Sequence, residues 1–265
     1  MSAGAHRGGA RGCVADMMNP AEFENIANAE NSFWWYRGMH EIALRLLRRT
    51  LPATPDRILE AGCGTGNFAL KVASEFGCPV DVVDLAGEGL RYARANGLQR
   101  MVQADIRALP IESGQYGCVL SLDVLIHLER GTERAAVAEL ARVARPGGLV
   151  MIRVAALDAL RSRHSAFTHE RQRFTKRRLL RLARENGLEP VRCTYLNSLL
   201  LPVALFRFRV WEPLMKAPVD SGVKPVAGWL DAALGSVLGF EGAIVGRGWD
   251  LPVGQTVVMI ARKRD

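Results

Sequence analysis

The sequence predicts an α/β fold, Rossmann-like in its order of strands and helices, on three observations. From about residue 57 onward, short apolar runs alternate with helix-like segments at a spacing typical of βαβ units around a parallel sheet. The stretch ILEAGCGTGNFAL, at 58–70, joins the first run to a helix start through three alternate glycines, which lets the backbone approach a nucleotide closely. A hydrophobic fraction of 49% in 265 residues suffices for one substantial core.

The apolar runs and the patterns between them assign the individual elements. We expect seven buried strands, at 58–60, 80–84, 101–104, 118–122, 149–154, 190–195 and 256–261. We expect helices between them, at 67–75, 87–96, 132–144 and 176–186. Thr175 is placed to cap the last of these helices and Gly187 to end it. The sequence ARPGG, at 144–148, ends one helix and leads into a strand.

The remaining stretches suggest covers for this core. The cluster FWWYR and the amphipathic HEIALRLLRR predict a helical N-terminal cover. The chain before the last strand is too long for a plain loop and has helical patterns at 199–211 and 225–245. The first residues contain no apolar signal-peptide region. We therefore expect five segments: a disordered tail (1–18), an N-terminal cover (19–50), a cofactor-binding core (51–195), a helical cap insertion (196–254) and the final core strand (255–265).

The net charge of +8 is concentrated in one segment. Ten arginine or lysine residues lie between Arg161 and Arg192, opposed by three glutamates. Such a block suits nucleic acid, anionic lipid or an acidic substrate. A solvated helix face in an arginine-rich chain also explains it, and we favour that interpretation. We therefore expect no nucleic-acid partner.

Cysteine usage and hydropathy indicate the compartment. Five cysteines are scattered without a CxxC pair, which argues against a zinc site or a disulfide framework and fits a reducing cytosol. We expect no metal and a cytoplasmic location. The longest apolar run, at 196–206, contains Pro202 and is shorter than the about 20 residues that a spanning helix needs. We expect no spanning helix, which leaves peripheral contact with a membrane open, and the sequence does not predict an oligomeric state.

The glycine-rich loop fits two cofactors. Read from Gly64, GTGNFA satisfies the fingerprint of NAD-binding folds. Read from Glu60, the pattern is E-x-G-x-G-x-G, with an acid at the end of the strand. A carboxylate there repels the pyrophosphate of a dinucleotide but suits S-adenosylmethionine, whose sulfonium and ammonium are positive. Further acids follow the second and third strands, Asp84 and Asp105, and the second of these is unusual for NAD proteins.

An ordered set of motifs resembles a known family: Glu60-x-Gly62-x-Gly64-x-Gly66, Asp84, QADIRALP (103–110), YGCVLSLDVLIHL (116–128) and ARPGG. Together they resemble class I S-adenosylmethionine-dependent methyltransferases, and the small-molecule branch typified by quinone-biosynthesis enzymes is most similar, over 58–154. The resemblance implies a seven-stranded sheet whose last strand is antiparallel and inserted between strands five and six. The chain departs from the family pattern at Gly117 and Ile126, where acids are usual.

The resemblance also implies which residues hold the cofactor. It assigns the loop of Glu60, Gly62, Gly64 and Gly66 to the cofactor backbone. It assigns Asp84, with Leu85 beside it, to the ribose, and Asp105 with the Ile106 amide to adenine. The backbone around Ser121 and Leu122 is expected to hold the methionine end, and Arg37 is a candidate for its carboxylate.

Residues for catalysis are less defined, because methyl transfer from a sulfonium needs mainly positioning, with a base for some acceptors. His127 lies just past the fourth strand, and His169 and His164 lie in the segment after the fifth. The first two are our candidate bases, although each can instead be a packing residue. The aromatic residues Trp34 and Trp35, with Tyr36, can close over the sulfonium or simply anchor the cover.

Four functions remain to be compared. We expect methyl transfer to oxygen or nitrogen of a small secondary metabolite or lipid-like acceptor. An RNA methyltransferase using residues 161–192 is the first alternative, although that block has few aromatics for base stacking. A non-catalytic S-adenosylmethionine-binding module is the second, and an NAD-dependent oxidoreductase, which Glu60 disfavours, is the third.

Overall fold

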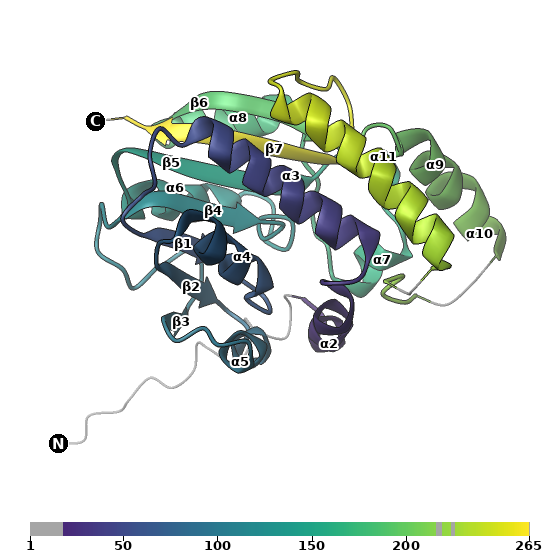
Figure 1. The fold of residues 1–265 in the computed structure, drawn as a ribbon, viewed down its shortest axis with the longest axis horizontal. Helices are drawn as coiled ribbons and strands as arrows, with labels where there is room; N and C mark the ends of the chain where they lie inside the picture. The colour runs from purple at the N-terminus through teal and green to yellow at the C-terminus, as the bar shows by residue number, and fades with distance from the viewer. Residues whose placement is uncertain (1–17, 216–218, 224–225, 265) are drawn as a thin grey trace.

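The computed structural model describes residues 18–215, 219–223 and 226–264, which form one seven-stranded sheet between helical layers (Figure 1). The strands are β1 (Ile58–Ala61), β2 (Val80–Asp84), β3 (Met101–Gln103), β4 (Tyr116–Leu122), β5 (Ala144–Ala155), β6 (Leu188–Leu196) and β7 (Thr256–Lys263). Their order is β3-β2-β1-β4-β5-β7-β6. Within this sheet β7 is antiparallel to both of its neighbours, and the other pairs are parallel. The predicted fold class and the position of the last strand are confirmed.

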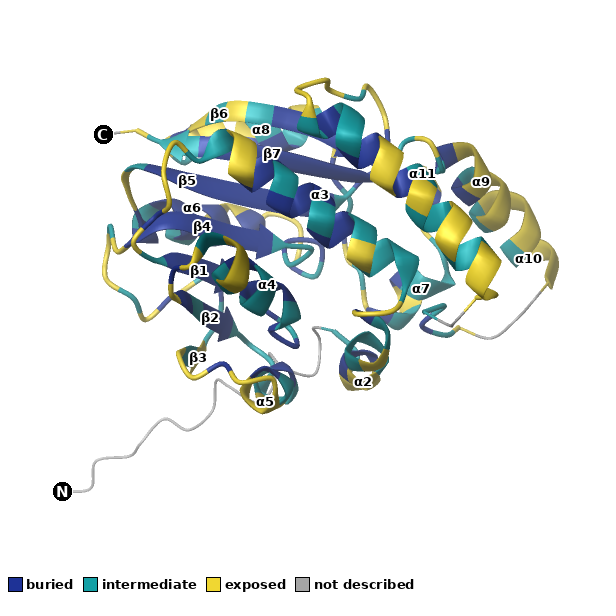
Figure 2. Cartoon of the chain, viewed as in Figure 1, coloured by how far each residue is buried: buried dark blue, intermediate teal, exposed yellow. Residues whose placement is uncertain are grey.

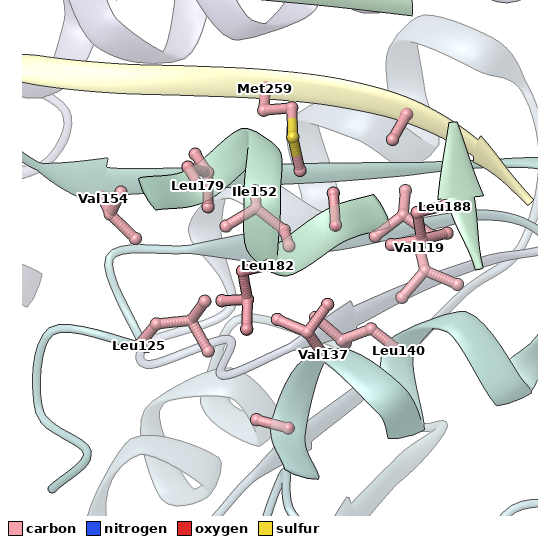
Figure 3. Packing of buried hydrophobic residues seen from close by; sticks show 14 of the residues in the cluster. Val119, Leu125, Val137, Leu140, Ile152, Val154, Leu179, Leu182, Leu188 and Met259 are labelled. Carbon is pink, nitrogen blue, oxygen red and sulfur yellow. The ribbon is translucent and has the colours of Figure 1, made fainter. Parts of the chain in front are cut away.

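Helices cover both faces of the sheet, because alternate strand residues point to opposite sides. Val119 and Ile152 enter one core, and their neighbours Leu120 and Met151 enter the other. Figure 3 shows the first core, where Val119 and Ile152 lie among side chains of two helices, Leu179 and Leu182 of one and Val137 and Leu140 of the other. The helices over that face are α6 (Glu133–Val143) and α8 (Lys176–Glu185), and those over the opposite face include α3 (Trp34–Thr50), α4 (Asn67–Phe76) and α5 (Gly87–Ala95). Thr175 caps α8 as predicted, accepting a hydrogen bond from the Arg178 amide at 3.2 Å.

The N-terminal cover consists of α2 (Pro20–Ala29) and α3, and α3 packs along α11 (Gly228–Gly246) from the other end of the chain (Figure 1). Asp231 of α11 fixes this pairing. Its carboxylate accepts hydrogen bonds from the Trp34 amide at 2.9 Å and from the Arg37 guanidinium at 2.5 Å. The start of the cover helix is therefore held by the cap insertion as well as by the core.

The cap helices differ in extent from the prediction. Short helices follow β5, namely η1 (Asp158–Leu160) and α7 (Arg163–Phe167), and a continuous helical segment follows β6, namely α9 (Leu201–Phe206), η2 (Arg207–Trp211) and α10 (Glu212–Met215). The helix expected at 199–211 thus continues to Met215, through a π-helical stretch. Pro213 does not end it, and the helical segment continues through this proline just after the π-helical stretch. The other predicted cap helix begins at Gly228, and part of its expected start lies outside the described residues.

Several strand boundaries also differ, two of them at predicted motifs. β5 begins at Ala144, so that ARPGG already belongs to the ladder with β4, with an irregularity in register before Leu149. β1 continues through Ala61, one residue beyond the predicted end at Glu60. The expected disordered tail falls on residues 1–17, outside the described part, apart from Met18. The four cysteines in the described part are buried and free, and this part contains no cluster of His, Cys, Asp or Glu suited to a metal.

One described helix, α11, is long and apolar enough to cross a membrane by length and composition. This helix is not the apolar run at 196–206, and its apolar pattern is interrupted by glycines and two acids, so the expectation of no helix of this kind was wrong by length and composition. In the fold α11 buries Leu238 and Val245 against the core and pairs Asp231 with α3. These contacts favour a fixed cover helix over a spanning segment.

Candidate active site

A cavity of about 880 Å³ lies at the carboxyl ends of the parallel strands. Its lining includes Glu60 of β1, Asp84 of β2 and Leu122 of β4, together with the loop after β1. The sheet order reverses between β1 and β4, and ligands of open α/β folds bind at such switch points. The opposite wall comes from α2, the start of α3 and the cap helices. The cavity volume is within the range of small-molecule sites.

The loop after β1 adopts a conformation that glycine permits. Gly62, Gly64 and Gly66 have φ angles of 87°, 54° and 75°, in the left-handed region. A Cβ on Gly62 would lie 2.1 Å from Cγ2 of Val124, so no larger residue fits there without a shift. Gly62 and Gly64 line the cavity, whereas Gly66 starts α4 behind them and packs on α5.

Asp84 holds the loop in place. One oxygen of its carboxylate accepts a hydrogen bond from the Gly64 amide at 2.7 Å, and the other accepts one from the Ala86 amide at 2.8 Å. Burial raises the pKa of Asp84, while these backbone hydrogen bonds act to lower it. Leu85, next in the chain, and Ile106, after β3, also line the cavity.

Three carboxylates lie around this end of the cavity, the buried Glu30 and Glu60 and the half-buried Asp84. None of the three forms an ion pair with lysine or arginine among the described residues. Burial raises the pKa of Glu60 to about 8 and that of Glu30 to about 7. One oxygen of Glu60 is buried and has no hydrogen-bond partner in the described part. Such a set disfavours an anionic ligand and is suited to a cationic one.

A buried arginine lies across the cavity from these acids. Arg153, near the end of β5, is 5% exposed and donates to the Asp123 carboxylate at 2.7 and 3.0 Å. Its guanidinium carbon is 5.6 Å from the ring centre of Trp35. The third nitrogen, Nη1, is buried without a described partner. Arg153 can therefore donate a further hydrogen bond from Nη1 to an anionic or carbonyl oxygen of a ligand.

Asp123 has an unusual backbone conformation for a non-glycine residue. Its φ of 59° follows directly on β4, and its amide donates to the Arg153 carbonyl at 2.8 Å. Left-handed residues of this kind gather at functional sites, because the surrounding structure must enforce them. The conformation brings the carboxylate toward Arg153 and places both residues in the cavity lining.

The two candidate bases have different positions. His127 lines the cavity, and burial lowers its pKa, so the ring is neutral at neutral pH. It shares a hydrogen bond with the backbone of His169, and its Nδ1 is buried without a partner in the described part. His169 has a φ of 56° and is absent from the cavity lining. The geometry therefore favours His127 of the two.

Two further predicted cofactor residues are absent from the cavity lining. Arg37 is turned to Asp231, as described above. The Asp105 carboxylate pairs with the neighbouring Arg107 guanidinium at 2.5 Å. Partial burial acts to raise the pKa of Asp105, but the hydrogen bonds from Arg107 prevail and lower it. Both assignments therefore require a local rearrangement when a cofactor binds.

The aromatic cluster of the cover reaches the cavity. Trp34, Trp35 and Tyr36 all contribute to the lining, and the rings of Trp35 and Tyr36 meet edge to face at 5.1 Å. Behind them, the Thr65 hydroxyl of the glycine loop donates to the Glu30 carboxylate at the end of α2. The cover is thus joined directly to the loop that it covers.

The basic segment is largely neutralised within the fold. Acidic partners within 4 Å are found for six of its arginines: Arg161, Arg171, Arg173, Arg178, Arg181 and Arg192. The pair of Arg173 with Glu170 is itself buried. This pairing agrees with the interpretation of the segment as a structural and solvated face.

Sequence reasoning missed several cavity residues. Arg153 could have been identified from the sequence, since it is the single charged residue in the apolar strand sequence GLVMIRVA. No sequence feature marks Glu22 and Glu30 as buried, because acidic residues are common on an amphipathic helix such as α2. Their burial results from the docking of α2 over the cavity.

Comparison with known proteins agrees with this geometry. Residues 58–148 match the family described as methyltransferase domain. The ubiquinone biosynthesis O-methyltransferase of Bordetella bronchiseptica is 31% identical over 161 residues, covering 55% of this chain and 64% of that protein. The malonyl-[acyl-carrier protein] O-methyltransferase of Enterobacter lignolyticus is 32% identical over 151 residues, covering 56% and 59%. The chain thus spans less than two thirds of the length of these relatives.

Solved structures share the fold at lower identity. Phosphoethanolamine N-methyltransferase 2 of Haemonchus contortus, in complex with S-adenosylmethionine, superposes with a TM-score of 0.55 at 18% identity, over 85% of this chain and 52% of that one. Geranyl diphosphate C-methyltransferase of Streptomyces coelicolor gives 0.54 at 16% identity, over 83% and 78%. The motifs, the matched family and the sheet order agree, and the chain carries a methyltransferase domain of the S-adenosylmethionine-dependent class.

Proposed function

We propose that this chain transfers the methyl group of S-adenosylmethionine to an oxygen or nitrogen atom of a small, lipid-like acceptor. The division of the cavity carries the proposal. Carboxylates without an ion pair surround the glycine loop, whereas the cover and cap line the other side with aromatic and apolar side chains interspersed with charged ones such as Arg163 and Glu212. Oxygen is the favoured atom, because the two curated relatives are named as O-methyltransferases.

The cofactor end is assigned by charge and hydrogen-bonding capacity. Glu60 and Glu30 suit the positive groups of the cofactor, and the second lone pairs of Asp84 suit its ribose hydroxyls. Leu85 and Ile106 would contact the adenine ring. The backbone near Leu122 would contact the methionine chain of the cofactor. For the cofactor carboxylate, Arg153 replaces Arg37 as our candidate, because its Nη1 is buried and unpaired at the cavity.

When bound, the cofactor would supply an activated methyl group on a positive sulfur, so that the acceptor atom bonds the methyl carbon while the sulfur–methyl bond breaks and the demethylated product leaves with a neutral sulfur. The chain contributes the cavity that holds both molecules and orients them for the transfer. An oxygen acceptor must also lose its proton. His127, neutral and at the cavity, is the group that we propose to receive it, after its Nδ1 becomes accessible to the acceptor.

The proposal is tested by transfer of label from methyl-labelled S-adenosylmethionine to a panel of amphiphilic phenols, fatty acids, amines and total RNA. We expect label in an organic-extractable phenol or acid. Label confined to RNA would support the first alternative, and binding without transfer to any acceptor would support the non-catalytic module. The ion pairs of the basic segment do not favour an RNA methyltransferase, and a relative named as an O-methyltransferase does not favour a non-catalytic module.

Replacing His127 by alanine should slow transfer to an oxygen acceptor by about 10²- to 10⁴-fold, the usual contribution of a general base. The affinity for the cofactor should stay unchanged in titration calorimetry. His169→Asn is the matched control, because asparagine tolerates the left-handed backbone and the imidazole is absent from the cavity lining. Equal rates for His127→Ala and the unaltered chain would show that no base acts at this position.

The preference for S-adenosylmethionine over its neutral-sulfur product should increase with pH. The folded pKa of Glu60 is raised from 4.5 to about 8, so its charge, which favours the sulfonium, develops as pH rises toward 8. The same shift destabilises the ligand-free fold over that window, because the ionised form is the disfavoured one. The affinity ratio should rise by up to about tenfold between pH 6 and 8. Calorimetric titrations of both ligands test this, and Glu60→Gln should reduce the pH dependence to the part that Glu30, with a pKa of about 7, contributes.

A further inference from the structure

The cap carries exposed apolar side chains that the proposed reaction does not use. Along α9, η2 and α10, Val203, Phe206 and Leu214 are 60%, 59% and 72% exposed. With Val210 they recur every three or four residues, which places them along one side of the helical segment. Exposed apolar patches of this extent mark interaction surfaces.

The helix α11 adds a second uncharged face. Trp229 and Phe240 are 75% and 63% exposed, and the exposed residues between them are alanine, serine and glycine. Both acids of α11 are turned inward, Asp231 to α3 and Glu241 into the core. The start of α11 lies at the same end of the molecule as α9 and α10 (Figure 1), and Figure 2 shows this end largely exposed. We call the six residues Val203, Phe206, Val210, Leu214, Trp229 and Phe240 the cap strip.

The charged residues near the cap strip are mainly basic. Arg209 and Arg247 are exposed, and neither has an acidic partner among the described residues. The acid on this segment, Glu212, is engaged by Arg207 at 3.7 Å and by the Arg163 amide at 3.2 Å. Tryptophan and leucine flanked by arginine are typical of helices that lie in a lipid headgroup layer. The positive charge of Arg209 and Arg247 would complement anionic lipid headgroups.

The cap strip borders the cavity. Trp211 and Met215, on the same helical segment, are 55% and 56% exposed and at the same time belong to the cavity lining, together with Phe208. An apolar path therefore leads from the outer surface of the cap toward the acceptor side of the cavity. A lipid surface held against the cap strip would lie next to that entrance.

We propose that the cap strip docks on an anionic membrane surface and that the acceptor is an amphiphile taken from that surface. The second part rests on the proposed function, whereas the docking does not. The helix α11 lies in the interface rather than across the bilayer, because leaving α3 would uncover Asp231 and Glu241.

Vesicle flotation without cofactor or acceptor tests the docking. The full chain should float with vesicles of phosphatidylcholine and phosphatidylglycerol and bind pure phosphatidylcholine far more weakly. In the double variant Phe206→Glu, Leu214→Glu the affinity for the anionic vesicles should fall by about tenfold or more. In the double variant Arg209→Gln, Arg247→Gln it should fall on the order of 30-fold. The matched control is Val102→Glu, an exposed valine on the distant strand β3, which should bind like the unaltered chain.

Absence of binding to the anionic vesicles, or equal binding by the Phe206→Glu, Leu214→Glu variant, would overturn the proposal. It would also fail if gel filtration showed a dimer that these two substitutions dissociate, since the cap strip would then be an interface between copies. Calorimetry with S-adenosylmethionine separates the two claims. A variant that binds the cofactor as tightly as the unaltered chain is folded. If the unaltered chain binds vesicles but does not bind S-adenosylmethionine, the proposed function is refuted and the docking proposal stands.

Discussion

Replacing Asp84 by alanine is expected to weaken S-adenosylmethionine binding by about 1.5–3 kcal/mol, or roughly 10- to 150-fold. Two losses combine in this result. The ribose would lose a charged acceptor, and the amides of Gly64 and Ala86 would lose the carboxylate that fixes the loop. Titration calorimetry of the purified variant measures the change directly.

Asp81→Ala is the matched control for this substitution. Asp81 lies three residues earlier in β2 and pairs with Arg100 and the Tyr116 hydroxyl, outside the cavity lining. Its removal can lower stability but should leave cofactor affinity within about twofold, as expected for a distant site. Equal affinities for Asp84→Ala and Asp81→Ala would remove Asp84 from the cofactor site.

Replacing Glu241 by alanine should destabilise the fold by about 3 kcal/mol, the largest effect on stability that we expect. Glu241 is 1% exposed, and its carboxylate accepts hydrogen bonds from three successive amides after β6, those of Asn197, Ser198 and Leu199. Without it, these amides lose their acceptor and α11 loses its link to the sheet. Thermal unfolding followed by circular dichroism should show a decrease in Tm of roughly 6–12 °C.

Glu189→Ala provides the comparison for that measurement. Glu189 is an exposed residue of β6 whose only described ion pair, with Arg264 at 3.8 Å, is itself exposed. Such pairs contribute little, so the free energy of unfolding should change by less than about 0.5 kcal/mol. A Tm for Glu241→Ala as high as that of Glu189→Ala would mean that water replaces the carboxylate at the three amides.

The fold and the glycine loop were predictable because their signals are local in sequence. Buried parallel strands require continuous apolar runs, and the turn after β1 requires glycines with positive φ, so each feature is written in consecutive residues. The end of the helical segment after β6 and the start of β5 were less predictable. Pro213 and the glycines of ARPGG usually interrupt regular structure, but here the helix and the strand continue through them.

The cavity residues that sequence reasoning missed depend on tertiary pairing. Arg153 reaches Asp123 because β4 and β5 pair in one register, with Leu122 opposite Arg153. Conversely, Asp105 was assigned from the family pattern and Arg37 from its place beside the aromatic cluster, but each pairs with an opposite charge nearby, Arg107 and Asp231 respectively. No spacing in the sequence reveals which charges will meet across elements.

The central claim, a site built for a sulfonium cofactor, is tested most directly by one calorimetric experiment. The unaltered chain is titrated with S-adenosylmethionine, with its demethylated product and with NAD under the same conditions. We expect the first two to bind and NAD not to bind, because Glu30, Glu60 and Asp84 leave uncompensated carboxylates where a pyrophosphate would lie. Binding of NAD without binding of S-adenosylmethionine would contradict the account.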